Sequence, residues 1–386
     1  MDLLVAAEVL QFRSQYRDNP SCECGRPFGL AVYQREFTRH PESAKQQESL
    51  MTDSYAPAVP QTEEPMTIDE FLADMDPELR AAYPAFQPFF EHWPTDAGEA
   101  RKLQAALMKK EPPRDGITRE DFTIPNRGVS GEIPARLYCA ERRSKRRGCV
   151  LWIHGGGWSA GSIDEDDFRC DRIAEEAGVA VVSVGYRLAP EDPFPAGLND
   201  CYRALEWMAG NTSAWHLDPA RVAVAGASAG GNLAAGVALM ARDRGGPSAA
   251  FQLLIYPALD SRLQAPSTHV IATKGMVLDR SMALFYRRDY LGADAEANTS
   301  PYAAPVLARD LAGLPPAYLM VGGLDLLRDD GVAYATRLMH ARVRTEIHVY
   351  PGAFHGFDNM VPDAAISRRA TADYIRALRD AVGDTA

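Results

Sequence analysis

The sequence predicts an α/β protein with a mostly parallel central sheet and helices on both of its faces. Two observations favour this class. From about residue 118 onward, short apolar runs alternate along the chain with amphipathic helical patterns. Several of these runs are apolar throughout, which is typical of strands buried on both faces. The strand–helix–strand order then places the helices in crossovers between parallel strands.

We predict strands over Gly148–Ile153, Val179–Val184, Arg221–Ala225, Phe251–Tyr256, Ala317–Val321 and Thr345–Tyr350. Helical patterns lie between them at Asp167–Ala177, Leu198–Ala209, Asn232–Arg242 and Gly331–Ala341. The connection between the strands at 251–256 and 317–321 is far longer than a crossover needs, and it holds a helical pattern of its own at 281–291. We therefore expect an insertion at about residues 260–315, on the edge of the sheet where ligands bind.

The residues before the predicted sheet divide into two regions. Thr67 and Glu70 have the spacing of a capping box, which predicts a helix from Ile68 to Met75, and a second helix is predicted over Glu99–Lys110. The predicted regions are an N-terminal extension at 1–55, N-terminal helices at 56–115 and the α/β domain at 116–386. One interpretation makes residues 1–50 a disordered extension, and the other makes Met51 the true start of the protein.

Composition excludes several classes of partner. The chain carries 41 Lys and Arg against 52 Asp and Glu, a net charge of −11. Such a chain is a poor binder of nucleic acid, and an anionic membrane surface would repel it. The basic run at 142–147 is therefore interpreted as a solvated loop.

Location and metal binding are also predicted from composition. No run of 18 apolar residues could cross a membrane, and the N-terminus does not resemble a secretory signal. Among six cysteines, Cys22 and Cys24 form a C-x-C pair that has no second Cys/His cluster nearby, so we interpret them as free thiols and predict no metal site. We expect a cytoplasmic protein.

The strongest motif is the G-A-S-A-G sequence at 226–230, with Ser228 at its centre. It follows the apolar run Val222–Ala225 and opens a helical pattern, which is the strand–turn–helix context of a nucleophile elbow. A serine in this position projects from a tight bend near a helix N-terminus, where developing negative charge is favoured.

A second motif, His154-Gly155-Gly156-Gly157-Trp158, comes directly after a predicted strand. Three consecutive glycines let the backbone turn its N–H groups toward one point. Two such donors and the N–H of the residue after the nucleophile can form an oxyanion hole. We expect His154 to brace this loop rather than to act as a base.

A nucleophilic serine needs a base, and the base needs an orienting acid. His355 lies in a glycine-rich loop just after the last predicted strand. Asp325 follows the strand before it, and Asp260, after the 251–256 strand, is the rival acid. The chain order Ser228, Asp325, His355 is the order found in α/β-hydrolases.

With these motifs in place, the sequence resembles the hormone-sensitive-lipase-like family of α/β-hydrolase carboxylesterases, known in bacteria as lipolytic family IV. The shared motifs, in family order, are HGGGW at 154–158, YRLAPE at 186–191, PFPA at 193–196, the serine turn, GGLDLLRDDG at 322–331 and PGAFHGF at 351–357. Asp167 and Cys170 also match the family's D-x-x-C. The resemblance covers about residues 65–380.

The resemblance implies a role for each matching residue. The implied catalytic residues are Ser228 as nucleophile, His355 as base and acid, and Asp325 as orienter, with oxyanion-hole donors at Gly156, Gly157 and Ala229 and supporting residues at His154, Gly155, Trp158, Asp167 and Glu191. The N-terminal helices and the 260–315 insertion would form a helical cap over the site. The implied substrate is a small ester with a short to medium acyl chain, and no metal or organic cofactor is needed.

Three positions depart from the family pattern, namely Ala227 before the serine, Leu326 after the acid and Asp330 where the family has Glu. Two alternatives to an esterase stay open. One is an amidase or deacetylase that uses the same triad. The other is a non-catalytic ligand receptor, as in the plant gibberellin receptors, which resemble the family but lack the triad histidine. The resemblance also allows a homodimer.

Overall fold

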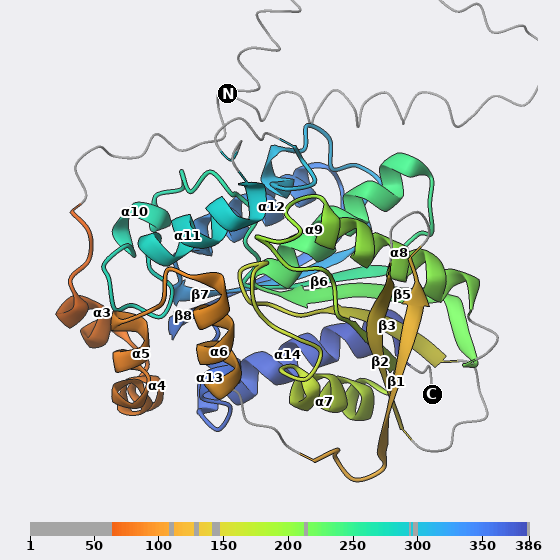
Figure 1. Ribbon diagram of the computed structural model, residues 1–386, viewed down its shortest axis with the longest axis horizontal. Helices are drawn as coiled ribbons and strands as arrows, with labels where there is room; N and C mark the ends of the chain where they lie inside the picture. Colours follow the sequence, from red (N-terminus) through yellow and green to blue (C-terminus); the bar gives the residue numbers. More distant parts are fainter. Residues whose placement is uncertain are drawn as a thin grey trace, which may run out of the picture. The chain divides into compact units, whose positions relative to one another are not determined.

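An eight-stranded sheet lies at the centre of the structure, with strand order β1–β2–β4–β3–β5–β6–β7–β8 (Figure 1). The structure is a computed structural model that describes residues 64–107, 112–126, 131–140, 147–211, 215–292, 295 and 300–383. β2 runs antiparallel to β1 and β4, and the strands from β4 to β8 in this order are parallel. The predicted fold class, a mostly parallel sheet flanked by helices, is confirmed.

The strands are β1 (Ile117–Pro125), β2 (Glu132–Ala140), β3 (Arg147–Ile153), β4 (Ala180–Val184), β5 (Leu217–Ala227), β6 (Phe251–Ile255), β7 (Ala317–Leu324) and β8 (Thr345–Phe354). The helices around the sheet are α7 (Asp167–Ala177), α8 (Ala196–Gly210), α9 (Ala229–Arg244), α12 (Arg328–His340), α13 (Phe357–Met360) and α14 (Ala365–Val382). α7 and α14 cover one face of the sheet, and α8, α9 and α12 cover the other (Figure 1).

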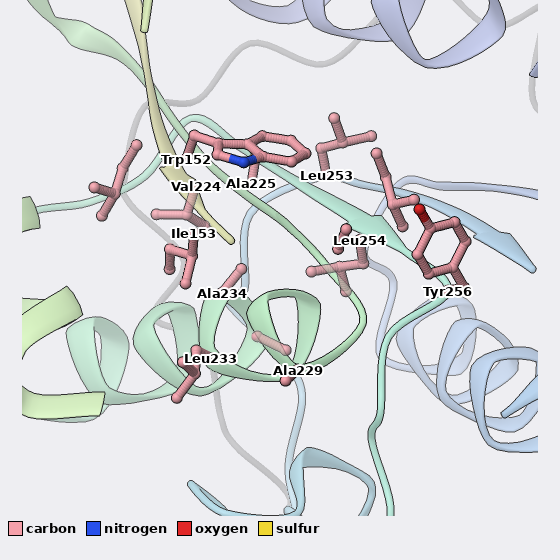
Figure 2. Close-up of a cluster of buried hydrophobic side chains, with 14 of the residues drawn as sticks. Trp152, Ile153, Val224, Ala225, Ala229, Leu233, Ala234, Leu253, Leu254 and Tyr256 are labelled. Carbon is pink, nitrogen blue, oxygen red and sulfur yellow. The ribbon is translucent and has the colours of Figure 1, made fainter. Parts of the chain in front are cut away.

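The core follows from the alternation of side chains along the central strands. β3 and β4 are buried throughout, as their apolar sequences predict. Figure 2 shows Ile153, Val224 and Leu254 on the side of α9, beside Leu233 and Ala234, whereas Trp152, Ala225 and Leu253 lie on the opposite side. The start of α9 lies directly against the sheet. Only a glycine allows this close approach at position 230, because a Cβ on Gly230 would lie 2.0 Å from the carbonyl oxygen of Ile153.

Two groups of helices lie outside this layered core. The N-terminal group is α3 (Ile68–Asp74), α4 (Pro77–Ala82), η1 (Tyr83–Ala85), α5 (Gln87–Glu91) and α6 (Ala97–Leu107), and the group between β6 and β7 is α10 (Ser267–Val270), α11 (Arg280–Leu291) and η3 (Pro305–Leu307). The two groups contact each other, because Met66 N–H donates to Val270 O at 2.8 Å and the Tyr83 hydroxyl donates to Gly275 O. Phe71 and Leu79 belong to the same buried cluster as the sheet residues, so the N-terminal group shares the core of the α/β domain.

Several local predictions are confirmed or corrected. The capping box is present, with the Glu70 N–H donating to Thr67 Oγ1 and the Thr67 N–H to Glu70 Oε2. The described part of the N-terminal region, residues 64–107 and 112–115, holds the α-helices α3, α4, α5 and α6, where two helices were predicted. Arg147, placed in the solvated basic loop, is instead buried at the start of β3, where its guanidinium donates to Cys139 Sγ and Ala140 O. The rest of that basic run, the cysteine pair at 22 and 24, and the choice of start site lie outside the described residues.

Besides the short helices α10, η3 and α13, three longer elements were not predicted, namely β1, β2 and α14. β1 and β2 alternate buried and exposed positions irregularly, because β1 is an edge strand with mixed polarity. α14 is an 18-residue helix with one buried stripe, and its apolar residues at helical spacing were a usable signal.

Within the described ranges, no helix combines the length and the apolarity needed to cross a membrane.

Candidate active site

Ser228 lies at the turn between β5 and α9, with φ 56° and ψ −119°. A left-handed φ is uncommon for a residue with a side chain, and such strain concentrates at functional sites. The backbone around the serine maintains the turn, since the Ser228 N–H donates to Ile255 O at 2.9 Å and the Ser228 carbonyl accepts from Ala258 N at 3.2 Å. The sharp turn predicted from the G-A-S-A-G sequence is therefore present.

The structure brings Ser228, His355 and Asp325 together at the carboxyl ends of β5, β8 and β7. His355 Nδ1 lies 2.8 Å from Asp325 Oδ2, and His355 Nε2 lies 2.9 Å from Ser228 Oγ. With the imidazole proton on Nδ1, Nε2 is free to accept the serine proton. Asp325 is completely buried, and its second oxygen accepts the Leu327 N–H at 2.9 Å, which fixes the plane of the carboxylate.

The rival acid, Asp260, has a different partner. Its carboxylate accepts two short hydrogen bonds from the Arg262 side chain, at 2.9 Å from Nε and 2.7 Å from Nη2. It lies beside the same pocket as Ser228. Of the two carboxylates that the sequence left as candidates, only Asp325 contacts His355.

The glycine loop adopts the conformation that its composition predicts. Gly156, Gly157 and Trp158 all have positive φ, at 110°, 60° and 60°. Neither Gly156 nor Gly157 tolerates a side chain, since a Cβ would lie 2.3 Å from Ala160 O in the first case and 2.2 Å from the Tyr286 ring in the second. Gly157 and Ala229 both line the pocket beside Ser228.

His154 is buried and does not contact the serine. Its Nδ1 lies 2.7 Å from Gly155 O, and its ring stacks on Tyr186 with centroids 4.3 Å apart. The Tyr186 hydroxyl donates back to His154 O at 3.1 Å. Burial lowers the pKa of His154, which favours the neutral imidazole. These contacts are the ones that a residue bracing the loop would make.

Comparisons with known proteins agree with this geometry. A family profile described as the α/β-hydrolase fold matches residues 150–359. Carboxylesterase NlhH of Mycobacterium tuberculosis is 37% identical over 314 residues, 80% of this chain and 97% of that protein. Carboxylic ester hydrolase LipN of the same organism is 36% identical over 74% of this chain and 76% of that protein. A solved bacterial heroin esterase superposes with a TM-score of 0.76 at 38% identity, over 81% of this chain and 99% of that one.

The chain belongs to the hormone-sensitive-lipase-like family of α/β-hydrolases. It is a carboxylic ester hydrolase. The predictions of the family, the fold class and the enzyme class are thereby confirmed.

The pocket of the esterase lies beside Ser228 and is partly open to solvent. Its walls are mainly apolar. The apolar lining includes Trp158, Leu263, Leu278, Ala283, Tyr286 and Leu327. The aromatic residues Trp158 and Tyr286 line the pocket, whereas Phe285 and Phe357 do not belong to its lining. Among the described residues, no group of three or more His, Cys, Asp and Glu could hold a metal ion.

Two of the supporting residues hold the scaffold of the esterase together. The Trp158 ring stacks on Tyr290 with centroids 4.3 Å apart, and its Nε1 donates to Asn232 Oδ1 at 3.2 Å. The Asp167 carboxylate accepts from Tyr138 at 2.6 Å and is also bound by Arg119 and Arg136. Asp167 thus ties α7 to β1 and β2, which explains the matching D-x-x-C motif without a role in the chemistry.

Glu191 leads to a residue that the motifs did not indicate, Arg101 of α6. The Arg101 guanidinium is bound to both Glu191 oxygens, at 3.0 and 2.6 Å. It also donates to Ser159 O at 2.6 Å and Ala189 O at 2.7 Å. Ser159 directly follows the glycine-loop motif, so one arginine of the N-terminal helices holds the end of the glycine loop. No local pattern singles out Arg101, because its partners lie far away in sequence.

We expect Arg101→Ala to lower the free energy of unfolding by about 2 kcal/mol, because two buried carbonyls lose their donor. We expect kcat/KM to fall about tenfold, because the glycine loop loses a restraint on its position. Denaturant unfolding and initial rates with a short-chain ester would measure both effects.

Glu191→Gln is the matched control for this change. It removes only the exposed ion pair, which should cost less than about 1 kcal/mol. If Arg101→Ala were as stable and as active as Glu191→Gln, the two carbonyl contacts would not matter.

Proposed function

We propose that this esterase hydrolyses its substrates through a Ser228–His355–Asp325 triad and an acyl-enzyme intermediate. The observation that carries the proposal is the continuous line of hydrogen bonds from the buried Asp325 carboxylate through His355 to Ser228 Oγ, at 2.8 and 2.9 Å. The serine at its end lies on a strained turn at the mouth of an apolar pocket.

In the proposed reaction, His355 Nε2 takes the proton of Ser228 as Oγ attacks the ester carbonyl. The tetrahedral intermediate collapses, His355 gives its proton to the leaving alcohol, and the acyl group stays on Ser228. Water then attacks the acyl-serine by the same route, with His355 as base, and the carboxylic acid leaves. Asp325 accepts the Nδ1 hydrogen throughout and stabilises the imidazolium that forms in each half of the cycle.

The oxyanion of each intermediate would be bound by the N–H groups of Gly156, Gly157 and Ala229. Two observations support this assignment. Gly157 and Ala229 line the pocket together with Ser228, and among the described residues none of the three N–H groups donates to a loop carbonyl or a side chain. Such a donor is typically worth about 10²–10³ in kcat.

We further propose that the substrates are esters with short to medium acyl chains. The apolar lining of the pocket favours an acyl chain over a charged group, and the chain length proposed is the one that the family resemblance implies. Three residues of the pocket lining, Leu263, Ala283 and Leu327, belong to one buried cluster. A homodimer and a cytoplasmic location stay predictions.

A panel of p-nitrophenyl esters from acetate to laurate, with one anilide, tests the proposal. We expect kcat/KM to be highest at the short end and to fall with the long acyl chains, and the anilide to react much more slowly than its matching ester. A fluorophosphonate should label Ser228. Anilide turnover equal to ester turnover would favour the amidase, and ligand binding without labelling would favour the receptor.

A further inference from the structure

Tyr256, the residue that follows β6, has an unusual backbone. Its φ of 33° is left-handed, which is rare for an aromatic residue. By strand alternation its side chain would share the face of Leu254, the side of α9 (Figure 2). Its hydroxyl instead contacts Arg169 of α7, on the opposite face, at 3.1 Å. Strain of this kind persists only where the surroundings hold it, and it is concentrated at functional sites.

The group that holds Tyr256 is a buried cluster of Tyr256, Arg169 and Asp358. Arg169 Nη2 donates to Asp358 Oδ2 at 3.0 Å, and the Tyr256 hydroxyl donates to Asp358 Oδ1 at 2.9 Å. The three residues are 3–4% exposed. Burial raises the pKa of Tyr256 well above its ordinary value, so the hydroxyl stays protonated and donates.

A second layer fixes the arginine. Arg169 Nη1 lies 3.8 Å from Asp166 Oδ1, and the guanidinium carbon lies 5.4 Å from the centroid of the Trp152 ring. Trp152 Nε1 in turn donates to Asp166 Oδ2 at 2.8 Å. Charged groups are costly to bury, and each member here is satisfied only while the others stay in place. The cluster is therefore stiff.

The stiff cluster holds the His355 loop at two points. The Tyr256 ring lies against the imidazole of His355, edge to face, with centroids 4.7 Å apart and planes at 63°. Asp358 comes three residues after His355, in α13, so its bonds to Arg169 and Tyr256 hold the end of the loop. None of the three cluster residues is part of the pocket lining.

We propose that Tyr256, held by Arg169 and Asp358, is a positioning residue that keeps the His355 imidazole in line between Asp325 and Ser228. The inference rests on the proposed function. The bond from Nδ1 to Asp325 alone leaves the imidazole free to tilt about that bond. The Tyr256 ring occupies the space into which it would tilt. Proton transfer to and from Nε2 depends steeply on this alignment.

The test is Tyr256→Phe, which keeps the ring and removes only the hydroxyl. With p-nitrophenyl acetate we expect kcat to fall about tenfold while KM changes less than about twofold, because alignment is lost and binding is not. The low-field proton resonance of the His355–Asp325 hydrogen bond should broaden or disappear. Asp358→Asn removes the charge that holds the same hydroxyl and should move both readouts in the same direction.

Tyr138→Phe is the matched control. Tyr138 is also fully buried and donates to a carboxylate, Asp167, that two arginines hold, but it does not contact His355. We expect it to lower the melting temperature to a similar extent and to leave kcat within about twofold of the wild type. The wild-type proton resonance should also be kept.

Each outcome decides the proposal. If Tyr256→Phe and Asp358→Asn kept the wild-type kcat and proton resonance, or if Tyr138→Phe lowered kcat as much as they do, the positioning role would be overturned. Should Tyr256→Phe not fold, Asp358→Asn decides by the same comparison. Fluorophosphonate labelling of the wild-type enzyme distinguishes a failure of the positioning role from a failure of the proposed function. A labelled, active wild type with unaffected variants removes only the positioning role, and a wild type that is not labelled at Ser228 removes the proposed function with it.

Discussion

Replacing Ser228 with alanine should lower kcat by about 10⁶, as expected when the nucleophile of a triad is lost. The variant keeps a Cβ at a position with φ 56°, so the backbone strain of the turn is unchanged. The hydrogen bonds from Ser228 N to Ile255 O and from Ala258 N to Ser228 O involve only the backbone and should persist. The melting temperature should therefore stay close to that of the wild type, and only the chemistry should be lost.

Initial rates with p-nitrophenyl acetate, together with fluorophosphonate labelling, measure this effect. Ser248→Ala is the matched control. Ser248 lies in the loop before β6 and lines a second pocket at the amino ends of β5 and β6, whereas Ser228 lies at the carboxyl end of β5. It should leave kcat within about twofold of the wild type. A Ser228→Ala enzyme that still turned over the ester near the wild-type rate would remove the nucleophile assignment.

Replacing Asp325 with asparagine should lower kcat by about 10⁴ with little change in KM, as for the same change in a serine-protease triad. The structure gives the reason at the level of atoms. The Leu327 N–H donates to Asp325 Oδ1, so it would select the amide oxygen of the asparagine at that position. The amide NH₂ would then face His355 Nδ1, and the imidazole proton would move to Nε2. An imidazole in that tautomer cannot accept the proton of Ser228.

Asp260→Asn is the comparison that tests the choice of acid. Asp260 is paired with Arg262 and lines the pocket, so its loss should change KM and stability more than kcat. A pH-independent loss in kcat as large as that of Asp325→Asn would show that the wrong carboxylate had been assigned. If Asp325→Asn kept most of the wild-type kcat, the proposed orienting role would fail as well.

The parts of the molecule that were predicted from sequence are those in which the signal is local. The capping box of Thr67 and Glu70 spans three residues, and the buried strands β3 and β4 are continuous apolar runs. β1 and β2 were missed because their exposed positions interrupt the alternation, and only pairing with a neighbour defines them. Arg147 was misplaced for a related reason, since a basic run looks solvated until its last member is seen to start a strand.

The sequence by itself determined the family, the nucleophile candidate, the base candidate and the glycine loop. Each of these is a short contiguous motif, and its backbone geometry is dictated by its own residues, such as the glycines around Ser228. Only the tertiary structure shows that Asp325 and not Asp260 contacts His355, that Arg101 contacts the glycine loop, and that a buried cluster lies behind His355. These interactions join side chains that are far apart in the sequence but close in space, and a hydrogen bond requires a distance of about 3 Å between its two heavy atoms. The spacing of residues along a single sequence does not show which distant side chains come this close.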